Sequence, residues 1–101
     1  MSFWNTSNPN KIMGIKDPDS LLDYPIDWSA WLTALGDSYL SHTIENITGG
    51  LVEVSSPESS GIITVWLSGG TLSETASFTV RIVTNGGRTE DRTFYLKIKE
   101  L

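Results

Sequence analysis

Thr64-Val65-Trp66-Leu67-Ser68-Gly69-Gly70-Thr71 is a run of strand-forming residues that ends at a pair of glycines. A second alternating run follows at residues 76–84, after a short polar link. Glycine tolerates the positive φ angles that tight reversals demand. This unit of strand, turn and strand recurs along most of the chain, so the sequence predicts an all-β fold.

Alternation of apolar and polar residues predicts where the strands lie. The expected strands are residues 24–32, 38–47, 51–54, 62–67, 76–84 and 92–99. Six short strands separated by turn signals favour an antiparallel β-sandwich of the immunoglobulin or fibronectin type III kind, with a small barrel as the alternative.

The first expected strand, residues 24–32, sets its apolar residues on one face: Ile26, Trp28, Ala30 and Leu32. Trp31 falls on the polar side, which makes it a candidate contact residue for a partner. Pro25 lacks a backbone N–H, so this strand should begin at a sheet edge or a bend.

Three further expectations concern individual strands. In residues 38–47, Leu40, His42 and Ile44 should share one side unless a bulge shifts the phase. Residues 62–67 are apolar on both faces, as in a strand covered on both sides or lying in an oligomer contact. The outward lysines of the last strand, Lys97 and Lys99, would suit an edge strand.

Residues 1–15 form an extended N-terminal arm in this interpretation, and residues 16–101 form the sandwich domain. The arm has no clean period of 2 or 3.6, yet it carries apolar residues at both ends: Phe3, Trp4, Ile12 and Met13. Two interpretations stay open for it. Either the arm crosses its own domain, or it docks on a neighbouring subunit, where these side chains would be contacts.

Composition excludes several classes of function. The net charge of -5 and the few scattered Lys and Arg residues disfavour nucleic acid as a partner. No apolar run reaches the length of about 18 residues that a membrane span needs. The chain has no cysteine, which excludes disulfides, thiolate metal sites and cysteine nucleophiles. Its start lacks the pattern of a signal peptide, so we expect synthesis in a bacterial cytoplasm.

Residues equipped for chemistry are scarce. His42 is the single histidine and lies within an expected strand, so we predict no metal, no cofactor and no catalytic residues. Asp17 precedes Pro18 and is expected to cap a turn rather than bind calcium. The mixed-charge cluster that starts at Arg88 has two interpretations, a solvated hairpin tip or a salt-bridged contact with a neighbouring subunit.

Three stretches together resemble a family of small tailed-bacteriophage virion proteins, described as fiber-tail adaptor or tail-associated immunoglobulin-like proteins. They are Lys16-Asp17-Pro18-Asp19-Ser20-Leu21-Leu22-Asp23-Tyr24-Pro25-Ile26-Asp27-Trp28-Ser29-Ala30-Trp31-Leu32, the opening stretch at residues 64–71, and Thr84-Asn85-Gly86-Gly87-Arg88-Thr89-Glu90-Asp91-Arg92-Thr93-Phe94. The likeness covers residues 16–101 and leaves the arm outside.

This resemblance implies a non-enzymatic structural module of the virion, which joins tail and fibers and is oligomeric in the assembled particle. Its partners would be tail, fiber or capsid subunits. Two alternatives remain: a decoration protein on the phage head, and a carbohydrate-binding sandwich in which Trp31, Trp66 or Tyr95 stacks on sugar rings.

Overall fold

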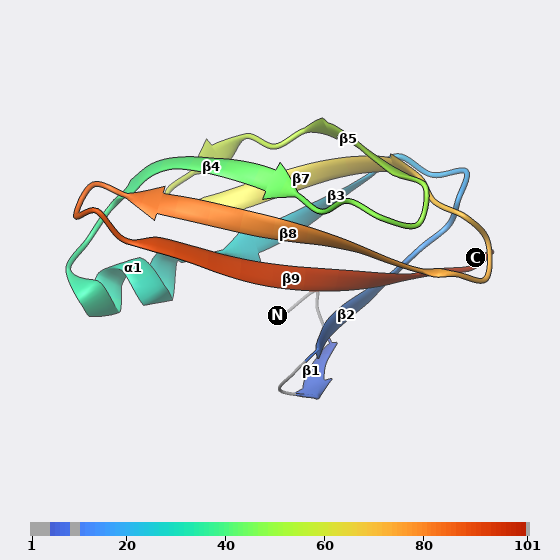
Figure 1. Cartoon of the computed structure of the whole chain (residues 1–101), viewed down its shortest axis with the longest axis horizontal. Helices are drawn as coiled ribbons and strands as arrows, with labels where there is room; N and C mark the ends of the chain where they lie inside the picture. The colour runs from blue at the N-terminus through green and yellow to red at the C-terminus, as the bar shows by residue number, and fades with distance from the viewer. Residues whose placement is uncertain (1–4, 9–10, 101) are drawn as a thin grey trace.

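The computed structural model describes residues 5–8 and 11–100 of the chain, and for residues 5–8 and 11–13 it describes the backbone only. Nine strands and one short helix follow one another along these residues (Figure 1). They are β1 (Asn5–Asn8), β2 (Lys11–Lys16), β3 (Leu22–Asp27), α1 (Ser29–Leu35), β4 (Tyr39–Glu45), β5 (Leu51–Ser55), β6 (Glu58–Ser59), β7 (Ile62–Gly69), β8 (Thr75–Thr84) and β9 (Thr89–Ile98).

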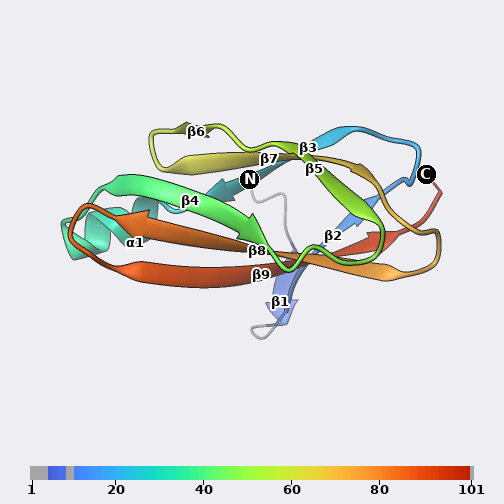
Figure 2. The same cartoon turned by 45° about the horizontal axis from the view of Figure 1, so that its top comes forward.

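Two separate sheets make up the fold, as expected for an all-β sandwich. One sheet, here called sheet A, has the strand order β1-β2-β9-β8-β4, and the other, sheet B, has the order β3-β7-β5 with β6 also paired to β7. Figure 2 shows them as two layers, with β5, β6 and β7 above β4, β8 and β9. No strand of the described chain pairs across the two sheets, so they form open layers rather than a closed barrel.

The last strand, β9, lies inside sheet A and not at its edge, so the edge-strand prediction from Lys97 and Lys99 was wrong. Strand β2 runs parallel to β9, with Ile15 opposite Lys97, and this pairing covers the side of β9 that β8 leaves free. The prediction of purely antiparallel sheets fails at the same pair. The parallel pairing joins chain segments far apart in sequence, and alternation within each strand carries no information about it.

The core lies between the sheets and is built mainly from alternate residues of β7, β8 and β9. Its fully buried hydrophobic members from these strands are Ile63, Val65, Leu67, Ala76, Phe78, Val80, Ile82, Leu96 and Ile98. Phe78 and Phe94, opposite each other on β8 and β9, stack with ring centroids 5.5 Å apart. Strand β3 completes this core from sheet B with Tyr24 and Ile26.

Close backbone packing requires the glycine pair Gly69-Gly70, at which β7 ends. Gly69 has a φ of 73°, and a Cβ at this position would lie 2.7 Å from the carbonyl oxygen of Gly50. Gly70 donates its N–H to that same oxygen over 3.0 Å. The turn therefore needs both the left-handed backbone and the missing side chain of glycine.

Residues 29–35 form the helix α1, so the strand predicted over residues 24–32 ends at Asp27. Trp28 and Leu32 are buried one helical turn apart, whereas Ala30 is exposed. The spacing of Trp28 and Leu32 is compatible with strand and helix alike, which is why alternation misplaced the boundary. The helix ends at Gly36, whose φ of 62° gives the left-handed C-cap. Asp37 then donates its N–H to the Leu32 carbonyl, as is common at such helix ends.

Three smaller expectations can be compared with the structure. The register of β4 shifts between Tyr39 and Ser41, and this bulge leaves Leu40 56% exposed while His42 stays half-buried. The strand that contains Pro25, β3, is an edge strand of sheet B, as that proline indicated. Asp17 caps its turn by accepting the Asp19 N–H over 2.8 Å.

Candidate functional site

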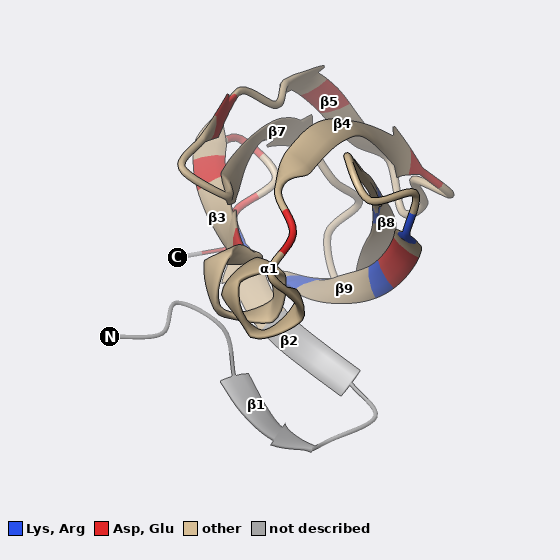
Figure 3. Ribbon diagram, turned by 90° about the vertical axis from the view of Figure 1, so that its left-hand side faces the viewer, with Lys and Arg blue, Asp and Glu red and all other residues tan. Residues whose placement is uncertain are grey.

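One end of the sandwich carries α1 together with the β8–β9 hairpin, and this α1 end holds the polar site best defined by the structure. Seen along the long axis, α1 lies across the opening between the two sheets (Figure 3). A pocket of about 370 Å³ lies beside it. Its lining comes from α1, the start of β4 and the β6–β7 turn: Ser29, Leu32, Thr33, Asp37, Ser38, Tyr39, Glu58, Ser60 and Gly61.

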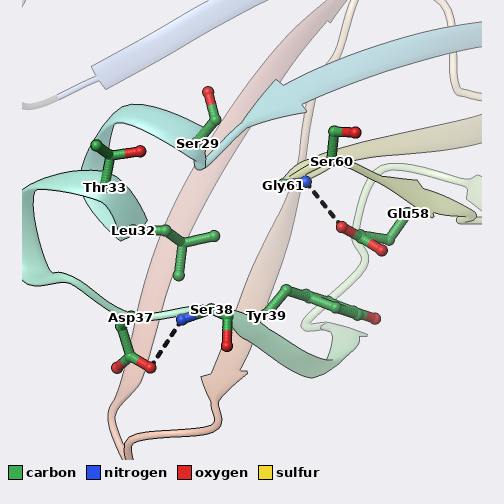
Figure 4. A pocket seen from close by; sticks show the side chains of 9 residues that line it. All are labelled: Ser29, Leu32, Thr33, Asp37, Ser38, Tyr39, Glu58, Ser60 and Gly61. Atoms are coloured by element: carbon green, nitrogen blue, oxygen red, sulfur yellow. Dashed lines mark hydrogen bonds between the residues drawn. The ribbon is translucent and has the colours of Figure 1, made fainter.

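Figure 4 shows Leu32 reaching from α1 toward the middle of this pocket, with a carboxylate on either side. Glu58 accepts the Gly61 N–H over 2.8 Å, and Asp37 accepts the Ser38 N–H over 2.8 Å. Each carboxylate is thus engaged in holding a backbone turn. The pocket offers no paired free carboxylates of the kind that acid–base catalysis uses.

Asp37 is the centre of the hydrogen bonds at this end, and its side chain is only 4% exposed. Oδ2 accepts the Thr84 hydroxyl over 2.7 Å and pairs with the Arg88 guanidinium over 2.7 Å. Oδ1 accepts the N–H of Gly86 over 2.9 Å as well as that of Ser38. These bonds, led by the Thr84 hydroxyl, hold the pKa of the Asp37 carboxyl well below its ordinary value.

Arg88, a predicted contact residue, therefore has a partner within its own chain. Asp91 of the same mixed-charge cluster also has a partner within the chain, because Arg81 binds Asp91 over 2.7 Å and Glu45 over 3.0 Å across three strands of sheet A. These latter pairs are exposed, and such pairs stabilise a fold by about 0–1 kcal/mol each. Arg88 keeps about half of its side chain in solvent and stays a candidate contact.

Trp31, the other predicted contact residue of this end, packs against buried Trp28. The two rings meet edge to face with centroids 5.3 Å apart. From β9, the guanidinium of Arg92 lies 4.2 Å from the centroid of a Trp28 ring, a cation–π contact. Trp28 Nε1 is buried, and among the described residues it has no hydrogen-bond partner. Trp31 is half-buried, and one face of α1 remains exposed beside it.

His42 joins the two sheets and is a satisfied structural residue. Its Nδ1 lies 2.7 Å from the Tyr39 hydroxyl, and its Nε2 lies 2.9 Å from the Ser56 hydroxyl, in the link between β5 and β6. A serine beside a histidine suggests a nucleophile and its base, but both hydroxyls here serve to fix the ring. No group of three potential metal ligands occurs in the part of the chain that the structure describes.

Lys16 is the polar residue that sequence reasoning missed. It is fully buried, and its Nζ donates to the carbonyl oxygens of Asp17 (2.9 Å), Ser20 (2.6 Å) and Gly69 (2.7 Å). Burial lowers its pKa. A lysine before an Asp-Pro turn normally lies in solvent, so the sequence held no signal for this role. For the structural role of Asp37 the sequence held a weak signal, because Asp37 directly follows Gly36, the glycine that ends α1.

The remaining predicted contact residues belong to the arm. Phe3 and Trp4 lie outside the described residues, and so do the side chains of Ile12 and Met13. The backbone of the latter two runs in β2, opposite Phe94 and Tyr95 of β9. The contact roles of all four stay predictions.

The three aromatic residues considered for sugar stacking lie on three different surfaces. Trp31 belongs to α1, Trp66 faces outward from sheet B, and Tyr95 faces outward from sheet A. They form no common platform on which one sugar chain could stack. The structure therefore gives the carbohydrate-binding alternative no site built from these residues.

No helix in the described parts of the chain is long and apolar enough to cross a membrane.

Comparison with known proteins gives the chain its family. No curated protein matches it. Residues 16–97 match the model of a family described as Podophage GP4 fiber-tail adaptor protein gp77. The match spans most of the chain. It begins at Lys16, which donates to backbone carbonyls, and includes the β8–β9 hairpin with Arg88 in its turn and Arg92 in β9. The chain therefore belongs to the podophage GP4 fiber-tail adaptor family.

Proposed function

We propose that this protein is a non-enzymatic structural component of the virion that joins tail and fiber proteins through protein–protein contacts. The family match over residues 16–97 carries this proposal. The α1 end supports it, because its carboxylates and its histidine hold the fold together and leave no set of groups free for catalysis. The family description names fiber and tail, which favours the tail over the head as its location.

An immunoglobulin-like module is the finer form of this proposal. In such sandwiches one sheet contains strands B, E and D and the other contains C, F and G. When the strands are lettered in chain order from β3 as B, with β6 left out, strands β3, β7 and β5 correspond to B, E and D. Strands β4, β8 and β9 then correspond to C, F and G. Strand β2 would be the A strand, and it lies beside β9 rather than β3. We place the start of this domain at residue 16, where the family match begins, and treat residues 1–15 as its arm, whose residues 11–15 run in β2 and add the A strand to sheet A.

The α1 end is our candidate for one of the contact surfaces, because it brings Trp31 and Arg88 to the same end of the sandwich. Each side chain is only partly covered by its own chain. An aromatic residue and an arginine are the residue types that most often dominate binding energy at interfaces. The apolar residues of the arm are a second candidate contact.

The test is to look for the protein in purified virions by mass spectrometry and to measure its binding to co-expressed tail, fiber and capsid proteins of the same phage. We expect virion peptides and a complex with tail or fiber proteins. Trp31→Ala and Arg88→Ala should weaken that complex, whereas Lys99→Ala, outside the α1 end, should not. A monomer that is absent from virions and binds none of these proteins contradicts the proposal. Binding to the major capsid protein alone favours head decoration.

A further inference from the structure

The outer face of sheet B carries an apolar stripe that no described part of the chain covers completely. Strand β7 alternates, so Ile63, Val65 and Leu67 are buried while the residues between them face outward. The stripe consists of Ile62, Trp66 and Val52, the last lying beside Ser68 on the neighbouring strand. Ile62 is 36% exposed and Val52 is 56% exposed, and Trp66 is half-buried.

Acidic residues border this stripe. Asp23 lies opposite Trp66 in the sheet, and Asp27 lies opposite Ile62. The Asp23 carboxylate is exposed and makes no hydrogen bond or ion pair within the described chain, while Asp27 uses one carboxylate oxygen to hold Ser29 at the start of α1. The strands of sheet B contain no lysine or arginine at all, as their sequences show. In Figure 3 the red of Asp and Glu marks β3 and β5, while β9 carries blue beside red.

The chain's own bases are poorly placed to complement this face in a second copy. Arg81 and Arg88 are bound to carboxylates, Arg92 lies over Trp28, and Lys16 is buried on backbone carbonyls. Among the described side chains this leaves Lys97 and Lys99 as the bases with no hydrogen bond, ion pair or ring contact. If two copies associated through sheet B, each acidic face would therefore meet a surface with few lysine or arginine side chains free to pair with it.

We propose that the outer face of sheet B is a docking surface for another virion protein, through a segment that combines apolar side chains with lysine or arginine. The stripe of Ile62, Trp66 and Val52 would pack against the apolar side chains of the partner's segment, and Asp23 would form an ion pair with its lysine or arginine. Charge complementarity across such a surface guides association and excludes like-charged partners. That the partner is a virion protein rests on the proposed function. That its segment carries apolar and basic side chains rests on the exposed residues of sheet B.

The experiment uses the full-length protein in intact virions. A photo-cross-linking residue, p-benzoylphenylalanine, replaces Trp66 in one phage and Thr43, which faces outward from sheet A, in a control phage. On irradiation we expect the residue at position 66 to cross-link to a different virion protein, within a segment that contains lysine or arginine. Cross-links to another copy of this chain, or to a segment without bases, overturn the proposal.

Charge reversal tests the electrostatic part on the partner so identified. We expect Asp23→Lys to weaken binding about threefold to tenfold, with a loss that shrinks as salt is raised. Glu74→Lys makes the same change of charge in the β7–β8 link and should leave binding unchanged. Trp66→Ala should weaken binding about 30-fold, as a central aromatic contact does. Equal effects of Asp23→Lys and Glu74→Lys overturn the pairing.

The two proposals fail differently. If the protein is present in virions but position 66 forms no cross-link, the docking surface is wrong and the structural role stands. If the protein is absent from virions, both proposals fail. Circular dichroism of Trp66→Ala checks that loss of binding is not loss of fold, which we expect to be intact because Trp66 lies outside the core.

Discussion

The Nζ atom of Lys16 lies 2.7 Å from the carbonyl oxygen of Gly69. This bond ties the end of β2 to the end of β7, so two of the stretches that resemble the adaptor family meet in space. The lysine supplies a buried donor to the carbonyls of Ser20 and Gly69, whereas the Asp17 carbonyl also accepts the N–H and the hydroxyl of Ser20.

Replacing Lys16 with methionine keeps the aliphatic stem and removes the donor. Buried acceptors left without a partner destabilise a fold by about 1–3 kcal/mol, and we expect Lys16→Met to lower the free energy of unfolding by that amount. Urea denaturation followed by tryptophan fluorescence measures it. Lys99 is exposed, and Lys99→Met should therefore change stability by less than about 0.5 kcal/mol. Equal effects of the two substitutions contradict the role of Lys16.

Alanine at Gly69 should be more costly than alanine at Gly36, although both glycines have positive φ. At Gly36 no atom lies within 4 Å of the added Cβ. Only backbone strain of about 1–2 kcal/mol is therefore expected there. At Gly69 the Cβ also meets the Gly50 carbonyl oxygen. Denaturation midpoints of the two variants give the comparison, and a Gly69→Ala protein as stable as Gly36→Ala shows that the β7–β8 turn relaxes freely.

Asp37 makes the stability of the fold depend on pH. Its folded pKa is depressed. The unfolded state therefore binds more protons as pH falls, and the stabilisation present above the ordinary Asp pKa of about 3.9 is lost below it. We expect Asp37→Asn to be less stable than the wild type at neutral pH, and the difference to shrink on acidification. Thermal unfolding across this pH range checks it.

Asp23→Asn, at an exposed carboxylate without an ion pair among the described residues, serves as the control for Asp37→Asn. It should leave the stability at neutral pH close to that of the wild type. If the difference in stability between Asp37→Asn and the wild type stays the same across this pH range, the prediction is wrong.

Arg92 stabilises the fold through its contact with Trp28 rather than through an ion pair. Removing a cation–π contact with a partly desolvated ring costs about 0.5–2 kcal/mol, so Arg92→Ala should be destabilised to that extent. Arg92→Lys keeps a cation, so its stability should lie between that of the wild type and that of Arg92→Ala. Because the contact is not a salt bridge, the loss should persist when chemical denaturation is repeated at high salt. A loss that vanishes with added salt indicates a charge partner instead.

The sequence by itself determined the strands and their inward faces. Residues 76–84 and 92–99 alternate apolar and polar side chains, and in a chain with one core this period indicates which side chains are buried. Residues 62–67 are apolar on both faces, so the sequence located this strand but not its buried side. Gly69 and Gly70, and the run at residues 85–87, placed the turns, because few other residues adopt the backbone they need. These turns lie in two of the three stretches that resemble the adaptor family.

Only the tertiary structure decided the position of β9, the helix α1 and the roles of Lys16 and Asp37. Pairing of β2 with β9 depends on contacts between segments distant in the chain, which no local pattern encodes. Trp28 and Leu32 fit a strand and a helix equally well, and packing of Trp28 against Arg92 and Trp31 accompanies the helix. A charged side chain is buried only where its partners already converge, and that convergence is a property of the assembled sheets.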